Sequence, residues 1–167
     1  MAEIVTEVLA EDEDLLAQQK AAEEYQRLQA QKEEERLRQE ELRKQREQEE
    51  RKQAIAKINS IVVDSYVFDK VELTDEHKCL LNEIAEILKK YDDLTIELVG
   101  HTCGKGYKSV NHRIGLRRAD AAKVYLVEQG ISESRIVVCS KGELDPKILL
   151  PSINERKLNR RVEIKVK

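Results

Sequence analysis

The sequence predicts an α+β protein, in which a long charged α-helix precedes a domain with a mixed sheet and the element order β-α-β-α-β-β. Two observations support this prediction. Residues 11–57 contain no Pro or Gly and are rich in Gln, Glu, Arg, Lys, Leu and Ala, all good helix formers. After Lys57 the apolar residues recur at strand spacing and at helix spacing in turn, which favours a sheet with helices packed on it.

The composition excludes several classes of protein. Among 167 residues, 38% are charged, and no run of the sequence reaches the ~18 apolar residues that a membrane-spanning helix needs. Three cysteines without regular spacing exclude a small scaffold held by disulfides. The length instead fits one domain of modest size with an appendage.

The charge is divided unevenly along the chain. Residues 1–57 carry 16 acidic and 11 basic side chains, a net charge of −5, whereas residues 58–167 carry 17 and 19, a net charge of +2. We therefore predict two parts: a charged helical spacer or weak coiled coil over residues 1–57, and a folded domain over residues 58–167. A net charge of +2 without a dense basic stripe excludes nucleic acid as a partner.

The first part has few apolar residues, and two interpretations of it stay open. A coiled coil needs apolar residues at positions a and d over several heptads, but none occurs between Leu42 and Ala54. A helix that is polar all round is usually a solvated spacer, and a disordered charged linker belongs to the same interpretation. The second interpretation is a homodimer through a weak coiled coil whose seam contains Leu15, Leu28, Leu37 and Leu42.

The domain begins with a predicted strand, helix and strand. Residues 61–68, "IVVDSYVF", are rich in β-branched and aromatic residues, so we predict a strand with Phe68 in the core. Thr74 precedes two acidic residues and is the expected N-cap of a helix over residues 75–91. Residues 95–100, "TIELVG", form the second predicted strand.

The second half of the domain continues the alternation. A glycine-containing loop, "HTCGKG", leads into a predicted helix over residues 108–129, with Gly130 at its C-terminal cap. Residues 135–140, "RIVVCS", form the third predicted strand. After a long loop, residues 160–166, "RRVEIKV", form the fourth.

A more specific pattern runs through the domain. The segments "LVGHTCGKGYKSVNHRIGLRRADAAKVYLVEQGI", "SRIVVCSKGELDP" and "NRRVEI" follow one another in the sequence. Because several spaced elements agree in order, residues 58–167 resemble the OmpA-like (OmpA/MotB C-terminal) peptidoglycan-binding domain. The residues that carry the resemblance are Gly100, His101, Thr102, Asn111, Arg118, Ala119, Gly130, Gly142, Pro146, Asn159, Arg160, Arg161, Val162 and Glu163.

The resemblance implies a non-catalytic receptor, without cofactor or metal, for the diaminopimelate of the peptidoglycan stem peptide. Arg118 matches the helix arginine that takes a carboxylate, which a planar guanidinium can grip with two hydrogen bonds. Asn111 matches an asparagine that helps to hold the peptide, and Thr102 lies in the same motif. Asp69 and Arg160 also match family positions, although pairing with a helix carboxylate is the alternative role for Arg160.

The sequence departs from the family pattern at one binding position. The family has an Asp after His-Thr, where it takes the ligand ammonium, but this chain has Cys103. A thiol of ordinary pKa is mostly neutral at pH 7 and forms no salt bridge with an ammonium. Three explanations stay open. Asp69 supplies the missing carboxylate, or backbone carbonyls of residues 104–106 accept the hydrogen bonds of the ammonium in its place. Alternatively, the domain has kept the fold and has lost, or changed, its ligand. The alternative function is therefore a structural or protein-interaction domain with a dimerising coiled coil.

Two other chemistries are disfavoured. His101 and Cys103 are suitably spaced for a thiol nucleophile, but no third orienting group is identifiable. Adding His112 does not give the paired ligand spacing of a zinc site. Cys79 and Cys139 are expected to be buried as small hydrophobic residues.

The expected location follows from the resemblance rather than from the N-terminus. The first ten residues, "MAEIVTEVLA", lack the positive region and the apolar core of a signal peptide. The resemblance implies the periplasm and association with the outer membrane. We therefore expect the signal or membrane anchor to belong to upstream segments that are absent from this chain.

Overall fold

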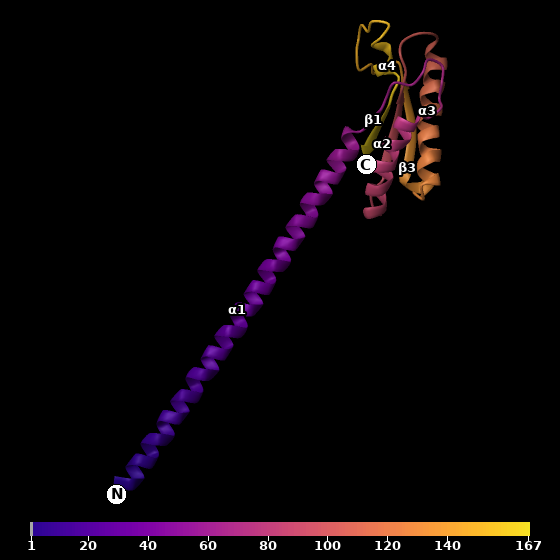
Figure 1. Ribbon diagram of the computed structural model, residues 1–167. Coiled ribbons are helices and arrows are strands. Elements are labelled where there is room, and N and C mark those ends of the chain that lie inside the picture. The colour runs from indigo at the N-terminus through magenta and orange to yellow at the C-terminus, as the bar shows by residue number, and fades with distance from the viewer. Residues whose placement is uncertain (1) are drawn as a thin grey trace. The chain divides into compact units, whose positions relative to one another are not determined.

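The computed structural model describes the backbone of residues 2–167 and the side chains of residues 18–167. The chain divides into two compact units, residues 1–50 and residues 51–167. In chain order the elements are α1 (Ala2–Ser60), β1 (Val62–Val63), α2 (Asp75–Lys90), β2 (Ile96–His101), α3 (Lys108–Glu128), a 3-10 helix (Glu133–Arg135), β3 (Ile136–Gly142), α4 (Arg156–Asn159) and β4 (Val162–Val166) (Figure 1).

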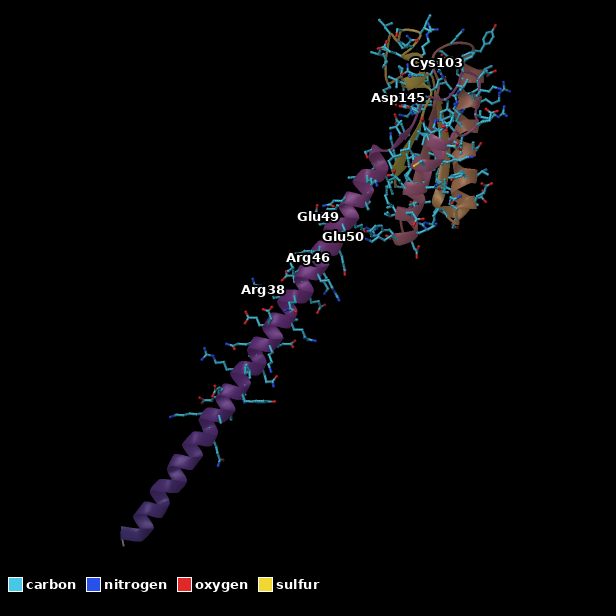
Figure 2. All side chains as sticks on the ribbon, viewed as in Figure 1. Arg38, Arg46, Glu49, Glu50, Cys103 and Asp145 are labelled. Atoms are coloured by element: carbon cyan, nitrogen blue, oxygen red, sulfur yellow. The ribbon has the colours of Figure 1, made fainter. Side chains whose placement is uncertain are left out.

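Residues 2–50 of the first unit belong to α1, which continues to Ser60 in the second unit, so the predicted long helix is confirmed. From residue 18 to residue 50 nearly all of its side chains are exposed (Figure 2), and Lys44 pairs with Glu40 one turn away, at 2.7 Å. The apolar side chains of the proposed seam that are described, Leu28, Leu37 and Leu42, are exposed. Leu15 lies outside the residues whose side chains are described. The homodimer remains a prediction.

The second unit confirms the predicted α+β class with a mixed sheet. The strand order is β1-β4-β2-β3. Strands β2 and β3 are parallel, whereas β4 runs antiparallel to both β1 and β2. The parallel pair requires a crossover connection, which α3 supplies. As a result, the ends of β2 and β3 lie side by side, and the loops that follow them meet at one end of the sheet.

The core lies between one face of the sheet and the helices. Ile96 and Leu98 of β2 and Ile164 of β4 point into it, and alternate residues such as Glu97 and Lys165 lie on the opposite, more polar face. This alternation is typical of a sheet with one face towards solvent. The helices contribute buried apolar side chains at helical spacing, namely Leu81, Ile84, Ala85 and Leu88 from α2 and Ala119, Ala122 and Leu126 from α3. Ile58, near the end of α1, is also buried in this core.

Both long helices of the domain begin and end as their sequences predict. Thr74 caps α2 by accepting a hydrogen bond from His77 N at 3.3 Å. In return His77 Nδ1 accepts from Thr74 N, which leaves Nε2 to donate to the Asp64 carbonyl at 2.7 Å. This reciprocal pair is a capping box with histidine in the position usually taken by Glu or Gln. Helix α3 is followed by Gly130 with φ of +93°, the left-handed conformation that favours glycine after a helix.

The predicted first strand is wrong over most of its length. Only Val62 and Val63 pair with β4, although residues 61–68 have strand-like composition. Ser65 and Asp69 both have a positive φ, of 64° and 60°, which is incompatible with an extended ladder. Residues 66–70 therefore form a loop, and Phe68 is exposed instead of packed in the core.

Two further expectations differ from the structure. Cys79 is exposed on α2, because it lies on the helix face turned away from the core, whereas Cys139 is half-buried as a free thiol. The long loop before β4 contains the short helix α4, which the sequence did not predict. A four-residue helix has too few turns to produce a helical apolar pattern.

Candidate ligand-binding site

Three chain segments meet at one end of the sheet and form the candidate site. The first follows β2, the second is the loop 66–70 after β1, and the third runs from the end of β3 to α4. Thr102 N donates to the Gly142 carbonyl at 2.8 Å, which joins the first segment to the third. Lys105 lies over the ring of Phe68, 5.1 Å from its centroid, which joins the first to the second. Figure 2 labels Cys103 and Asp145 at this end of the domain.

Arg118 is the buried centre of this arrangement. It lies on α3 and is 1% exposed. Its Nε donates to the Lys70 carbonyl at 2.9 Å, Nη2 to the Val67 carbonyl at 3.2 Å and Nη1 to the His101 carbonyl at 3.4 Å. Three of its five N–H donors are thus engaged with backbone of the two loops. The guanidinium therefore holds the loop 66–70 against the end of β2.

The charge of Arg118 has no carboxylate partner within ion-pair distance in the described part of the chain. Its guanidinium carbon lies 4.9 Å from the centroid of the Tyr66 ring, so part of its stabilisation is a cation–π contact. Burial lowers the pKa of Arg118 to about 10, and the charge is therefore still present at neutral pH. A buried cation without an anion is costly unless a ligand provides one.

Asp69 belongs to the loop 66–70, and Arg160 contacts the same loop. Arg160 Nε donates to the Tyr66 carbonyl, so this arginine binds backbone instead of a helix carboxylate. The Asp69 side chain is exposed and its backbone adopts φ of +60°. Both predicted site residues therefore lie close to Arg118. Arg160, however, donates its hydrogen bond to the backbone of the loop.

A pocket of about 670 Å³ opens beside these loops. The segment from Cys103 to Lys105 lines one side of it. The other side is formed by Pro146, Ile148 and their neighbours up to Asn159. Its walls combine aliphatic side chains with the charged side chains of Lys105, Arg156 and Glu143. Such a mixture of apolar walls and a few polar groups is typical of small-ligand sites.

Asn111 and Glu143 join the pocket to the start of α3. The Asn111 amide is buried, and its Nδ2 donates to Glu143 Oε2. Glu143 also lines a smaller cavity of about 380 Å³ on its other side, next to Lys108 and His112. The predicted binding residue Asn111 thus contacts the pocket through Glu143, which is not among the site residues predicted from the sequence.

Two buried side chains fix the shape of the pocket wall. Asn159 Oδ1 accepts from Ile148 N and its Nδ2 donates to the Ile148 carbonyl, both at 2.8 Å. Arg161 donates to the Asp145 carbonyl at 3.1 Å and pairs with Glu163 on the adjoining strand. Arg161 therefore pairs with a strand carboxylate, and not with a helix carboxylate. Both contacts tie the long loop to residues of the Asn-Arg-Arg motif.

His101 lies beneath the site and is completely buried. Burial lowers the pKa of its imidazole, and the charge of Arg161 lowers it further. Burial raises the pKa of Glu163, but the hydrogen bond from Arg161 Nε, at 2.9 Å, and the charges of Arg161 and Lys165 together lower it below its ordinary value. Neutral His101 thus lies beside an ion pair, with its Nε2 3.7 Å from the Glu163 carboxylate.

The structure brings most of the predicted site residues to this end of the sheet, but they differ in access. Cys103 lines the pocket, whereas Thr102 is buried behind it with a hydroxyl that has no hydrogen-bond partner among the described residues. Among residues with described side chains, no cluster of His, Cys, Asp and Glu could hold a metal ion. No described helix is both long and apolar enough to cross a membrane.

A family model and individual relatives both match the domain of this chain. The model of the OmpA family matches residues 65–160. Over 99 residues the chain is 38% identical to Outer membrane protein A of Bordetella avium, covering 59% of this chain and 51% of that protein. It is 32% identical over 110 residues to the Peptidoglycan-associated lipoprotein of Pseudomonas aeruginosa, covering 66% of this chain and 65% of that protein. The chain thus spans about half the length of the Bordetella protein.

Solved structures show the same fold. The peptidoglycan-associated lipoprotein from Burkholderia pseudomallei superposes with a TM-score of 0.61 at 25% identity, covering 64% of this chain and 89% of that one. The C-terminal domain of Helicobacter pylori MotB, at 19% identity, gives a TM-score of 0.59 over 64% of this chain and 84% of that one. The family match extends over more than half of the sequence and includes the loops of the site. The chain therefore belongs to the OmpA family.

Proposed function

We propose that this chain binds the peptidoglycan stem peptide through its diaminopimelate residue and anchors a cell-envelope protein to the cell wall. Binding is non-catalytic and takes place in the periplasm, in association with the outer membrane. Membership of the OmpA family and the names of the peptidoglycan-associated relatives support this proposal.

The uncompensated charge of Arg118 is the observation that carries the proposal. The guanidinium is buried next to the site and two of its N–H donors have no partner among the described residues. A ligand carboxylate would supply both the missing anion and the missing acceptors. Because Arg118 is 1% exposed, the loop 66–70 has to move aside, and the ligand then replaces the carbonyls of Val67 and Lys70.

The aliphatic part of the pocket fits the rest of the ligand. Diaminopimelate has a methylene chain that ends in a carbon bearing both an amine and a carboxylate. The walls around Ile148 and Pro146 can cover the methylene groups, while charged groups recognise the two ends. Asn159 holds the backbone of Ile148 in place, so the wall is formed before the ligand arrives.

Sedimentation with purified sacculi tests the proposal. We expect the full chain to sediment with sacculi and Arg118→Lys to lose about 10- to 100-fold in affinity, because a lysine keeps the charge but cannot form two parallel hydrogen bonds to a carboxylate. Arg117→Lys is the matched control, since Arg117 is the adjacent arginine on the same helix and is less buried than Arg118. Circular dichroism spectra should show that both variants are folded.

A second measurement separates carboxylate recognition from effects on the loop. The wild-type chain is titrated with a stem peptide whose diaminopimelate side-chain carboxyl is free, and with one in which it is amidated. We expect the free acid to bind more tightly, and Arg118→Lys to lose this preference. Equal retention of Arg118→Lys and wild type on sacculi would show that Arg118 is not the carboxylate receptor.

A further inference from the structure

Glu143 is an acidic residue in the wall of the pocket that Cys103 also lines. It follows β3 directly. The hydrogen bond from Thr102 N to the Gly142 carbonyl connects the residues immediately before each of them, which keeps their two segments adjacent. The Glu143 side chain is half-buried, so part of it is open to a ligand.

Glu143 is a carboxylate that has an amide donor but no cation. In the described part of the chain, no Lys, Arg or His lies within ion-pair distance of it, whereas nearby Asp145 pairs with Lys141 at 2.7 Å. The buried Asn111 amide donates to it and fixes its position. An amide orients a carboxylate without neutralising it, so the charge remains available to a cationic ligand.

The two other sources of a carboxylate or carbonyl fit less well. Asp69 is exposed on the loop 66–70 and does not line the pocket. The backbone carbonyls of residues 104–106 are neutral acceptors, so they cannot form a salt bridge with an ammonium. Glu143 is therefore the acidic side chain that shares the pocket with Cys103.

We propose that Glu143 receives the side-chain ammonium of the bound diamino acid, in place of the carboxylate that Cys103 lacks. This inference rests on the proposed function, because it assumes that the pocket takes diaminopimelate. An ammonium has three donors, and the carboxylate oxygen that Asn111 leaves free can accept one of them. Glu143 and Arg118 together then provide opposite charges for the amine and the carboxylate of one ligand.

The experiment compares the binding of two stem peptides to the full wild-type chain and to its variants by isothermal titration calorimetry. One peptide carries the free side-chain amine of diaminopimelate, and in the other this amine is acetylated. We expect wild type to prefer the free amine by about tenfold or more, as a charge-assisted hydrogen bond predicts. In Glu143→Gln the ratio of the affinities for the two peptides should fall close to one, although the glutamine side chain can still accept the hydrogen bond from Asn111. Asp145→Asn, which makes the same charge change in the same loop, should keep the preference.

Restoring the carboxylate at the family position provides a rescue. The double variant Cys103→Asp with Glu143→Gln should recover the preference for the free amine, because the new carboxylate would face the same pocket. An unchanged preference in Glu143→Gln, or its loss only in Asp69→Asn, would overturn the role of Glu143 and leave the proposed function standing. If wild type binds neither peptide, the proposed function and this inference both fail.

Discussion

Arg118 and Glu143 carry opposite charges that the rest of the described chain does not balance. Arg118 is buried among backbone carbonyls and the Tyr66 ring, and Glu143 is held by the Asn111 amide alone. In contrast, Arg161 pairs with Glu163, and Lys141 pairs with Asp145. Glu143 lines the pocket, and Arg118 is buried at the same end of the sheet. Two unmatched charges of opposite sign are complementary to a ligand that is itself zwitterionic.

At the residue scale, the burial of His101 gives the fold a dependence on pH. The folded-state pKa of His101 is lowered by burial, whereas in the unfolded chain it returns to about 6.5. Below that pH the unfolded state binds a proton that the folded state does not, so the free energy of unfolding decreases as the pH falls. One such group lowers the free energy of unfolding by at most ~1.4 kcal/mol for each pH unit.

Urea unfolding at about pH 7.5 and about pH 5.5, on either side of the ordinary histidine pKa, measures this effect. We expect wild type to lose stability between the two values, and His101→Gln to lose less. His112→Gln, a change at an exposed position of α3, should lose as much as wild type. The same decrease in His101→Gln as in wild type would contradict the role assigned to His101.

Site residues that belong to a motif are predictable from the sequence, whereas residues that only the fold brings together are not. Arg118 and Asn111 occupy family positions, and both lie at the site. Glu143 was missed because its importance depends on the contact with Asn111, 32 positions earlier in the sequence. Phe68 and Cys79 are apolar residues whose exposure depends on the local backbone path and on the helix face, which composition does not determine.

At the scale of elements, the packing of α3 on β2 depends on two glycines. A Cβ at Gly100 would lie 1.9 Å from the Gly115 carbonyl oxygen, and a Cβ at Gly115 would lie 2.3 Å from Ser140 Oγ. The backbone of the helix thus contacts the backbone of the strand directly. This close approach places Arg118, about one helical turn beyond Gly115, beneath the end of β2.

Gly100→Ala should therefore destabilise the domain. The added methyl group collides with backbone, which cannot turn aside as a side chain can, and we expect the free energy of unfolding to fall by about 1–3 kcal/mol in urea denaturation. Gly104→Ala is the control, because no atom lies within 4 Å of its added Cβ. Equal stability of wild type and Gly100→Ala would show that the helix and strand can separate at little cost.

The helices and the three longer strands were predictable because each has a clear hydrophobic period or cap. Helix α2 begins after Thr74 and α3 is followed by Gly130, as their residue types indicate. The first strand was not predictable, because Ser65 and Asp69 leave the extended conformation where Arg118 and Arg160 bind the loop carbonyls. Those contacts join residues 51 and 94 positions apart, beyond any local pattern.

At the scale of the whole molecule, the chain combines a polar helix with a domain that has its own core. The core cluster draws on residues from Ile58 to Ile164, all within the second unit. The helical unit lacks a continuous apolar seam, and its described leucines are exposed. Its role as a spacer or as a weak coiled coil therefore stays a prediction, which analytical ultracentrifugation of the full chain can decide.

Binding of the stem peptide at the end of β2 is the central claim, and amide chemical shifts of the ¹⁵N-labelled full chain test it most directly. On titration with a stem tripeptide that ends in diaminopimelate, we expect saturable shifts at Cys103, Lys105 and Glu143. Ile136, at the opposite end of the sheet beside Ile96, should not shift. Absence of saturable shifts, or shifts confined to the Ile136 end, would contradict the claim.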